Sequence, residues 1–132
     1  MSRTETRQKA DVTMRVAITA SKGSIDSPVD QRFGRARYLI VVDIDTGSVD
    51  ICDNEVNLNA AQGAGIQTAQ NIAQMNVEAV LTGHVGPNAF RTLTAAGIKA
   101  YTGLQGTVEE AVEQFKIGNL SPVDSADVEG HW

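Results

Sequence analysis

Residues 79–101 read AVLTGHVGPNAFRTLTAAGIKAY and contain a complete strand–helix–strand unit. Its first four residues are apolar or β-branched and stop at a glycine, which predicts a short buried strand. A helix is expected over residues 87–96, because proline is favoured in the first turn and glycine, here Gly97, just after the last. Residues 98–101 predict the next strand. Such a unit joins two parallel strands by a right-handed crossover, so the sequence predicts an α/β fold.

Three more strands are expected on the N-terminal side of this unit. Residues 15–20 and 38–42 are apolar runs of strand length, and residues 49–52 follow Asp45-Thr46-Gly47, where glycine can adopt the positive φ of a tight turn. The last two runs therefore predict a hairpin. Because a hairpin pairs its strands antiparallel and the crossover pairs them parallel, we expect a mixed sheet with helices on both faces.

Two further helices complete the predicted order of elements. Residues 60–75 repeat apolar side chains at helical spacing. Gly63 and Gly65 weaken the first turn of this helix by roughly 1 kcal/mol each relative to alanine, so something other than helix propensity is expected to require them. The C-terminal helix begins after Thr107, which forms a capping-box pattern with Glu110.

The length of 132 residues suits one domain. We expect it to span residues 14–118, after a disordered leader at 1–13 and before an acidic, flexible tail at 119–132. The expected domain carries 8 basic and 11 acidic side chains, and the whole chain has a formal net charge of −5. No broad basic surface is therefore expected, which argues against nucleic acid as a partner.

Neither a membrane nor an export route is indicated by the sequence. No apolar run reaches the ~20 residues of a membrane span, and the leader lacks the hydrophobic stretch of a secretory signal. The expected location is the cytoplasm. Cys52 is the single cysteine of the sequence, which excludes an intramolecular disulfide, a CxxC metal cage and an iron–sulfur site built from four thiolates of one chain. We expect Cys52 to pack as a small apolar residue.

The first candidate for binding chemistry is the segment DQRFGRAR at residues 30–37. It holds three arginines within six residues, with Arg32 and Arg35 flanking Phe33-Gly34. Guanidinium groups suit anions, because their donors form a planar fork and their charge does not titrate away. Gly34 would let a ligand approach the backbone closely. The alternative is that the arginines are solvated surface charges and Phe33 fills the core.

The second candidate is the segment TGHVGPN at residues 82–88, between a predicted strand and a predicted helix. In open α/β sheets ligands bind at the carboxyl ends of the strands, and the N–H groups and dipole of a helix N-terminus attract anions. The spacing matches neither a Walker loop nor a G-x-G-x-x-G dinucleotide motif. The alternative is a tight turn that uses its glycines for geometry alone. The candidate residues here are Gly83, His84, Val85, Gly86, Pro87 and Asn88.

The end of the first strand supplies the remaining candidates. If that strand is parallel to its neighbours, then Thr19, Ser21 and Lys22 lie on the same edge of the sheet as the second segment. His84 is also a candidate metal ligand, since imidazole binds soft and borderline metals. The alternative for His84 is a hydrogen-bonded structural histidine. The other histidine, His131, lies in the expected tail.

The predicted elements and the two candidate segments, taken in their order along the chain, resemble the dinitrogenase iron–molybdenum cofactor family. The resemblance rests on Arg32-Phe33-Gly34-Arg35-Ala36 before the hairpin, on Gly83-His84-Val85-Gly86 before a helix, and on GTVEEAV at residues 106–112. It covers roughly residues 14–120. It implies a three-layer α/β/α domain around a five-stranded mixed sheet of ribonuclease H-like topology.

Members of this family bind or carry molybdenum- and iron-containing sulfide clusters, so the resemblance implies binding rather than catalysis. The nearest likeness holds a molybdenum–copper–sulfide cluster without covalent attachment. Such a cluster brings its own sulfide ligands, which agrees with the single cysteine. The implied cofactor is a molybdenum-containing sulfide cluster, with or without copper, or one of the iron–molybdenum type. The implied partners are the cluster or thiomolybdate, and proteins that donate or accept the cluster.

Carried across, the resemblance places Arg32, Phe33, Gly34 and Arg35 in one wall of a site and Gly83, His84 and Gly86 in the other. Two departures bear on how a cluster would be held. Some relatives have histidine-rich tails, whereas this tail has only His131. Where some relatives carry a histidine, residues 57–62 offer Asn57, Asn59 and Gln62. These departures favour capture by charges and amide groups over direct ligation by histidine.

Two other classes of function remain as alternatives. A ribonuclease H-like hydrolase needs several carboxylates converging on two metal ions. The first strand has no carboxylate, and Asp43, Asp45 and Asp50 gather at the hairpin, as turn and surface residues would. A protein-interaction or regulatory module would bind an anion only incidentally.

Overall fold

The structure is a computed structural model, and it describes residues 14–55 and 63–124. Its elements confirm the predicted order of strand, loop, hairpin, helix, strand, helix, strand and helix. They are β2 (Arg15–Ala20), the 3-10 turn η2 (Phe33–Arg35), β3 (Tyr38–Asp43), β4 (Val49–Asp53), α2 (Ala64–Ala73), β5 (Ala79–Leu81), α3 (Pro87–Ala95), β6 (Lys99–Tyr101) and α4 (Val108–Lys116). The expected leader, residues 57–62 and His131 lie outside the described residues.

The five strands form one sheet in the order β4-β3-β2-β5-β6. β3 runs antiparallel to both β2 and β4, which confirms the hairpin. β2 is parallel to β5, and β5 is parallel to β6, as the crossover between them requires. The sheet is therefore mixed, and its strand order and directions are those of the ribonuclease H-like topology.

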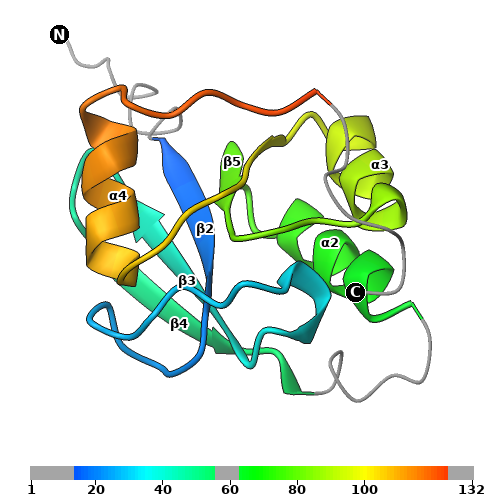
Figure 1. The fold of residues 1–132 in the computed structure, drawn as a ribbon, viewed down its shortest axis with the longest axis horizontal. Coiled ribbons are helices and arrows are strands. Elements are labelled where there is room, and N and C mark those ends of the chain that lie inside the picture. The colour runs from blue at the N-terminus through cyan, green and yellow to red at the C-terminus, as the bar shows by residue number, and fades with distance from the viewer. Residues whose placement is uncertain (1–13, 56–62, 125–132) are drawn as a thin grey trace, which may run out of the picture.

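Helices cover both faces of the sheet and give the domain three layers (Figure 1). In that view α4 lies to the left of the strands, and α2 and α3 lie to the right. The cluster on the α2–α3 side takes alternate strand residues, including Ala17, Leu39, Val41, Val80 and Ala100. The cluster on the α4 side takes their neighbours, including Val16, Ile18, Ile40, Ala79 and Leu81. Strands buried on both faces explain the near-continuous apolar runs of the sequence.

The described start of the expected tail contacts this domain. The Val123 N–H donates to the carbonyl of Ala100 in β6 at 2.8 Å. Val123 also packs against the core on the α2–α3 side, and Leu120 packs against the core on the α4 side. Residues 119–124 therefore contact the folded domain, while its boundary at residue 118 stays a prediction.

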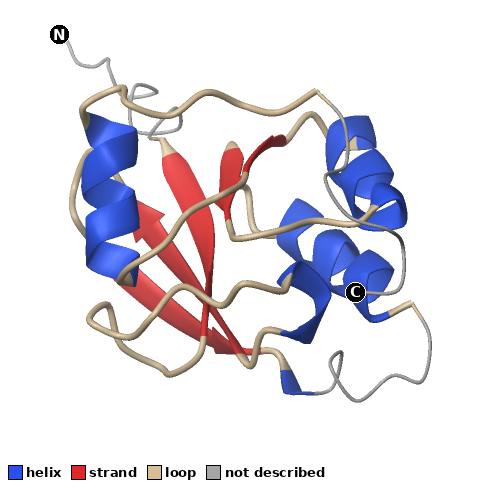
Figure 2. Ribbon diagram, viewed as in Figure 1, coloured by secondary structure: helices blue, strands red, loops and turns tan. Residues whose placement is uncertain are grey.

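The strand directions bring several loops to one edge of the sheet. β2, β4, β5 and β6 all run the same way, since β3 alone is antiparallel to its neighbours. Their carboxyl ends, and the loop that leads into β3, thus share an edge with the first residues of α2 and α3. Figure 2 shows η2 as a short helical turn beside α2 at this edge. No helix in the described part of the chain is long and apolar enough to cross a membrane.

Candidate anion-binding site

The two segments singled out in the sequence touch each other through their backbones. Arg32 and His84 form an isolated parallel β-bridge. The Phe33 N–H donates to the His84 carbonyl at 3.1 Å. The arginine segment therefore lies alongside the strand–helix turn, and their residues share one stretch of the carboxyl edge.

Gly83 makes this close approach possible. A β-carbon on Gly83 would lie 2.6 Å from the Cα atom of Gln31, closer than real side chains come to a backbone atom. The side-chain amide of Gln31 donates through Nε2 to the Leu104 carbonyl at 3.0 Å and so connects the arginine segment to the loop after β6. Gln31 is a residue that the sequence reasoning missed, because an exposed glutamine in a loop gives no local signal of its partner.

Gly34 sits against the first turn of α2. A β-carbon on Gly34 would lie 2.7 Å from both the Cα and the N atom of Gly65. This contact supplies a reason for Gly65, which weakens the helix by its propensity alone. Gly63 is the N-cap of α2. The sequence indicated that Gly63 and Gly65 serve something beyond helix propensity, and the structure identifies the arginine segment as a contact of Gly65.

The N-termini of α2 and α3 differ from that of α4. Both begin after a glycine, with no side-chain cap and no acidic residue in the first turn. α4 has the predicted capping box between Thr107 and Glu110, and Glu109 adds a second carboxylate to its first turn. A helix N-terminus carries a partial positive charge that carboxylates or bound anions offset. At α2 and α3 the first turns supply no such carboxylate.

Of the three arginines, Arg37 is compensated by its neighbours. Its guanidinium binds Asp53 through two hydrogen bonds of 3.1 Å and lies 3.2 Å from a Glu55 oxygen. It also lies over the Tyr38 ring, 5.2 Å from the centroid. The hydrogen bond from Arg37 holds the pKa of Asp53 below its usual range. The Arg37 side chain therefore belongs to a surface ion-pair group with Asp53 and Glu55.

Arg32 has a different environment. Its backbone N–H donates to an Asp30 carboxylate oxygen at 3.0 Å, while the residue as a whole is exposed. Within residues 14–55 and 63–124, no hydrogen bond or ion pair of the Arg32 guanidinium is found. Arg35 closes the η2 turn and is half-buried. The charge of Arg32 is thus presented beside His84 at the edge of the sheet.

Phe33 occupies the core, as the alternative interpretation expected. It is 1% exposed and belongs to the cluster on the α2–α3 side. Val85 is fully buried in the same cluster. These two side chains anchor their segments in the core, whereas Arg32 is exposed and His84 is half-buried.

The other predicted residues of the second segment lie at the start of α3. Gly86 is its N-cap and Pro87 stands in its first turn. Asn88 is exposed, and its side-chain oxygen accepts a hydrogen bond from Arg91 at 3.1 Å. His84 is half-buried. No group of three or more His, Cys, Asp or Glu side chains that could hold a metal ion occurs in the described part of the chain.

The residues at the end of β2 are divided between the interior and the surface. Thr19 is fully buried beneath the two segments, and its hydroxyl bonds the Asp30 carbonyl at 2.9 Å. Ser21 and Lys22 are exposed. Ser21 pairs with Pro28 through its backbone N–H at 3.2 Å. In the described part of the chain, no hydrogen bond or ion pair joins Ser21 or Lys22 to residues 32–35 or 83–88.

The carboxylates of the hairpin and Cys52 have the surroundings that the sequence suggested. Asp43 accepts the backbone N–H groups of Asp45 and Thr46 at 2.9 and 3.1 Å, as a turn residue does. Cys52 is half-buried against the core on the α2–α3 side. Asn57, Asn59 and Gln62, which stand where some relatives place a histidine, lie outside the described residues.

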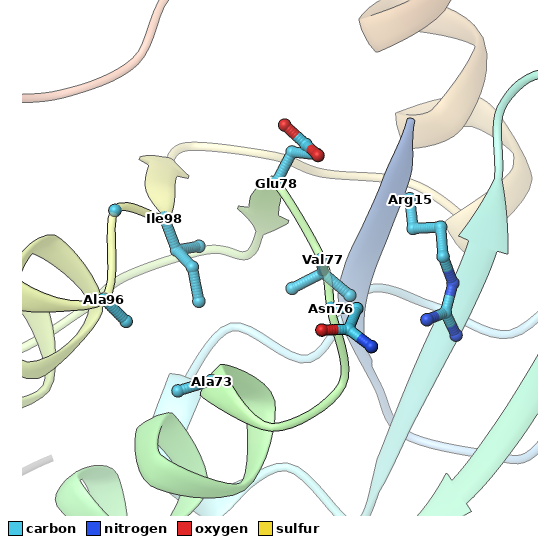
Figure 3. A pocket seen from close by; sticks show the side chains of 8 residues that line it. Arg15, Ala73, Asn76, Val77, Glu78, Ala96 and Ile98 are labelled. Carbon is cyan, nitrogen blue, oxygen red and sulfur yellow. The ribbon is translucent and has the colours of Figure 1, made fainter. Parts of the chain in front are cut away.

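A separate hollow of about 530 Å³ lies at the opposite edge of the sheet (Figure 3). It is lined by Arg15, Ala73, Asn76, Val77, Glu78, Ala96, Gly97 and Ile98. Arg15 donates to the Met75 carbonyl and lies 3.7 Å from Asp50, so its charge already has partners. This hollow shares no lining residue with the two segments.

Fold and loops together define a class: a small three-layer α/β/α domain whose arginine segment and strand–helix turn meet at the carboxyl edge of the sheet. The chain matches the dinitrogenase iron–molybdenum cofactor family over residues 14–118. It belongs to that family.

Solved structures and a curated relative agree with this assignment. The chain is similar to the apo form of the orange protein from Desulfovibrio gigas, with 39% identity and a TM-score of 0.85 over 88% of this chain and 98% of that one. It is also similar to a NifB-like Thermotoga protein of the DUF35 family, with 38% identity and a TM-score of 0.76 over 89% and 99% of the two chains. An uncharacterised Methanocaldococcus jannaschii protein is 30% identical over 91 residues, which are 67% of this chain and 76% of the relative.

Proposed function

We propose that this protein is a non-catalytic carrier that binds an anionic, molybdenum-containing sulfide cluster between residues 31–37 and 83–88. The sequence resemblance favours a molybdenum–copper cluster, and the alternative is a cluster of the iron–molybdenum type. Membership of the cofactor family and the likeness to the orange protein support metal-cluster binding or carriage in general. The cluster is cargo in this proposal. Other proteins would deliver it to this protein or receive it.

The observation that carries the proposal is the position of Arg32. The exposed residue Arg32 pairs with His84 through the backbone, three residues before α3 begins at Pro87. Gly34, in the same segment, lies against Gly65 in the first turn of α2. An anion placed there would meet a permanent charge, backbone N–H donors and two helix dipoles of favourable sign. Such preorganised donors can offset the cost of taking a charged group out of water.

The chemistry of these donors suits outer-sphere capture. Backbone amides and guanidinium groups hydrogen-bond to sulfide or oxide atoms of an anion without displacing the ligands of its metals. His84 remains the one residue of the two segments that could add direct ligation. The proposal therefore requires no protein thiolate, and Cys52 keeps its packing role.

Binding of tetrathiomolybdate, with and without cuprous ion, tests this function. We expect the protein to form a stoichiometric complex with a new visible absorption band at micromolar concentration. Arg32→Gln should weaken binding roughly 10- to 150-fold, since a charge-assisted hydrogen bond contributes about 1.5–3 kcal/mol. Arg37→Gln is the matched control: Arg37 lies in the same segment, but its side chain is paired with Asp53 and Glu55, so the substitution removes the same charge without removing a donor to the anion.

The control decides what the arginine effect means. If Arg32→Gln and Arg37→Gln weaken binding equally, the effect is one of net charge and the proposed site is wrong. If the unaltered protein forms no complex with either reagent at micromolar concentration, the proposed function is wrong.

A further inference from the structure

Two buried hydroxyl groups lie directly beneath the arginine segment. Thr19, near the end of β2, and Thr82, just after β5, are both fully buried. Their side-chain oxygens are 2.7 Å apart, which is a strong hydrogen bond between hydroxyls. β2 and β5 pair in register up to Ile18 and Leu81, so Thr19 and Thr82 occupy the next position of the same ladder.

This pair holds Asp30 in place. The Thr19 hydroxyl donates to the Asp30 carbonyl at 2.9 Å, and the Asp30 N–H donates to the Thr19 carbonyl at 2.8 Å. Because the Thr19 proton is used in this way, Thr82 is the donor between the two hydroxyls. The Thr82 oxygen lies 3.5 Å from the same Asp30 carbonyl, at the limit of a hydrogen bond.

Asp30 in turn fixes the backbone of Arg32, the arginine whose guanidinium has no partner among the described residues. Its carboxylate accepts the backbone N–H of Arg32 at 3.0 Å. The next residue, Phe33, donates its N–H to His84. A continuous chain of hydrogen bonds thus runs from the buried threonines through Asp30 to the backbone of Arg32, one residue before the contact with His84.

We propose that Thr19 and Thr82 are positioning residues, whose buried hydroxyl pair sets where Arg32 stands relative to His84 without touching the bound anion. This inference rests on the proposed function for its binding consequence. It gives Thr19 a role different from the direct contact expected of it in the sequence. Thr82, predicted only as part of the turn, becomes its equal partner.

The reason for a hydroxyl pair at this point is the absence of ordinary strand pairing. Beyond Ile18 and Leu81 the Thr19 carbonyl accepts the Asp30 N–H at 2.8 Å, and the Thr82 N–H donates to the Tyr101 carbonyl at 3.0 Å. The side chains therefore bridge two strands whose backbones have taken other partners. An apolar side chain of the same shape would leave the Asp30 carbonyl without its Thr19 donor in a buried place.

Substitutions of equal size separate the hydroxyl from its packing. Thr19→Val keeps the volume and removes the hydroxyl, whereas Thr19→Ser keeps the hydroxyl and removes the methyl group. Ile18→Val is the matched control, because it deletes one methyl from the neighbouring buried residue on the opposite face of β2. Thr82→Val is the second variant and removes the other hydroxyl. Two quantities are measured: the hydrogen-exchange rate of the Phe33 amide, and the affinity for tetrathiomolybdate.

We expect Thr19→Val and Thr82→Val each to speed exchange of the Phe33 amide and to weaken tetrathiomolybdate binding, both by about fivefold, the effect of one lost hydrogen bond of ordinary strength. Thr19→Ser should restore both quantities to near the unaltered values, and Ile18→Val should change neither. If either valine variant fails to fold, the other and Thr19→Ser still decide the outcome.

The inference is overturned if the valine variants leave Phe33 exchange and binding unchanged, or if Thr19→Ser behaves like Thr19→Val. The exchange measurement needs no ligand. A protein that binds no tetrathiomolybdate would therefore overturn the proposed function, while the Phe33 amide would still report whether the threonine pair positions the segment.

Discussion

Glycines decide how closely the backbone segments of this site can approach one another. Gly83 lies against Gln31, and Gly34 lies against Gly65 in the first turn of α2. In both contacts one or both partners lack a side chain, so the backbones meet at distances that a β-carbon would forbid. The arginine segment is consequently held between the strand–helix turn and α2.

Gly34→Ala should lower the free energy of unfolding by about 1–3 kcal/mol, because the new methyl group would overlap backbone atoms that cannot rotate away. The sign of this change in the free energy of unfolding shows whether Gly34 is packed against α2 or lies in open space. Gly34 does not have a positive φ, so in open space alanine would instead stabilise the protein by about 0.4–1 kcal/mol through the unfolded state. Urea unfolding measures the difference.

Gly23→Ala is the matched control for this substitution. Gly23 also lacks a positive φ, and its nearest neighbour would be 3.4 Å away in the Ile51 side chain, which is an ordinary contact. We expect this variant to be as stable as the unaltered protein or slightly more so. Equal stability of Gly34→Ala and Gly23→Ala would contradict the packing of the arginine segment on α2.

All three helices α2, α3 and α4 follow carboxyl ends of strands, but they differ in how their first turns are satisfied. α4 has its own side-chain cap and two carboxylates in the first turn, whereas α2 and α3 have neither. The capping box of α4 contributes to stability, typically by about 1 kcal/mol for the cap residue. The other two helices forgo this stabilisation at the edge where the anion is proposed to bind.

Asn88→Asp should therefore change stability and binding in opposite directions. A carboxylate in the first turn of α3 interacts favourably with the helix dipole and should raise the free energy of unfolding by about 0.3–1 kcal/mol. The same negative charge should repel a bound anion and weaken tetrathiomolybdate binding. Thermal or urea unfolding and equilibrium dialysis give the two quantities.

Asn119→Asp supplies the control for net charge. Asn119 is exposed and follows the C-terminal end of α4, where its N–H bonds Gln114 at 3.0 Å. The substitution adds the same charge on the α4 side of the molecule, and we expect it to leave binding unchanged. If Asn88→Asp also leaves binding unchanged, the N-terminus of α3 is not part of the anion site.

For the molecule as a whole, the sequence was sufficient to predict the elements, and the topology explains the site. The apolar runs, the hairpin turn, Pro87, Gly97 and the capping box are local signals, and each predicted its element to within a few residues. The parallel direction of β2, β5 and β6 then brings their carboxyl ends to one edge. The expected meeting of the arginine segment with the strand–helix turn follows from that direction.

The details of the site depend on contacts between residues far apart in the sequence. Three arginines look alike in the segment, but only the hairpin partner Asp53 and its neighbour Glu55 single out Arg37 as compensated. The pairing of Thr19 with Thr82 joins residues 63 positions apart. Burial of Phe33 and Thr19 likewise depends on how the layers close over them. None of these contacts leaves a periodic or motif-like signal.

The most direct test of the central claim is to locate the bound anion by NMR on the isotopically labelled protein. On addition of tetrathiomolybdate, we predict the largest amide shift changes at residues 31–35, 64–66 and 83–88. Changes should be small at residues 107–110, where the first turn of α4 is already capped. Shift changes centred on the hollow beside Arg15 and Asn76, or spread evenly over the surface, would contradict the claim that the two segments hold the anion.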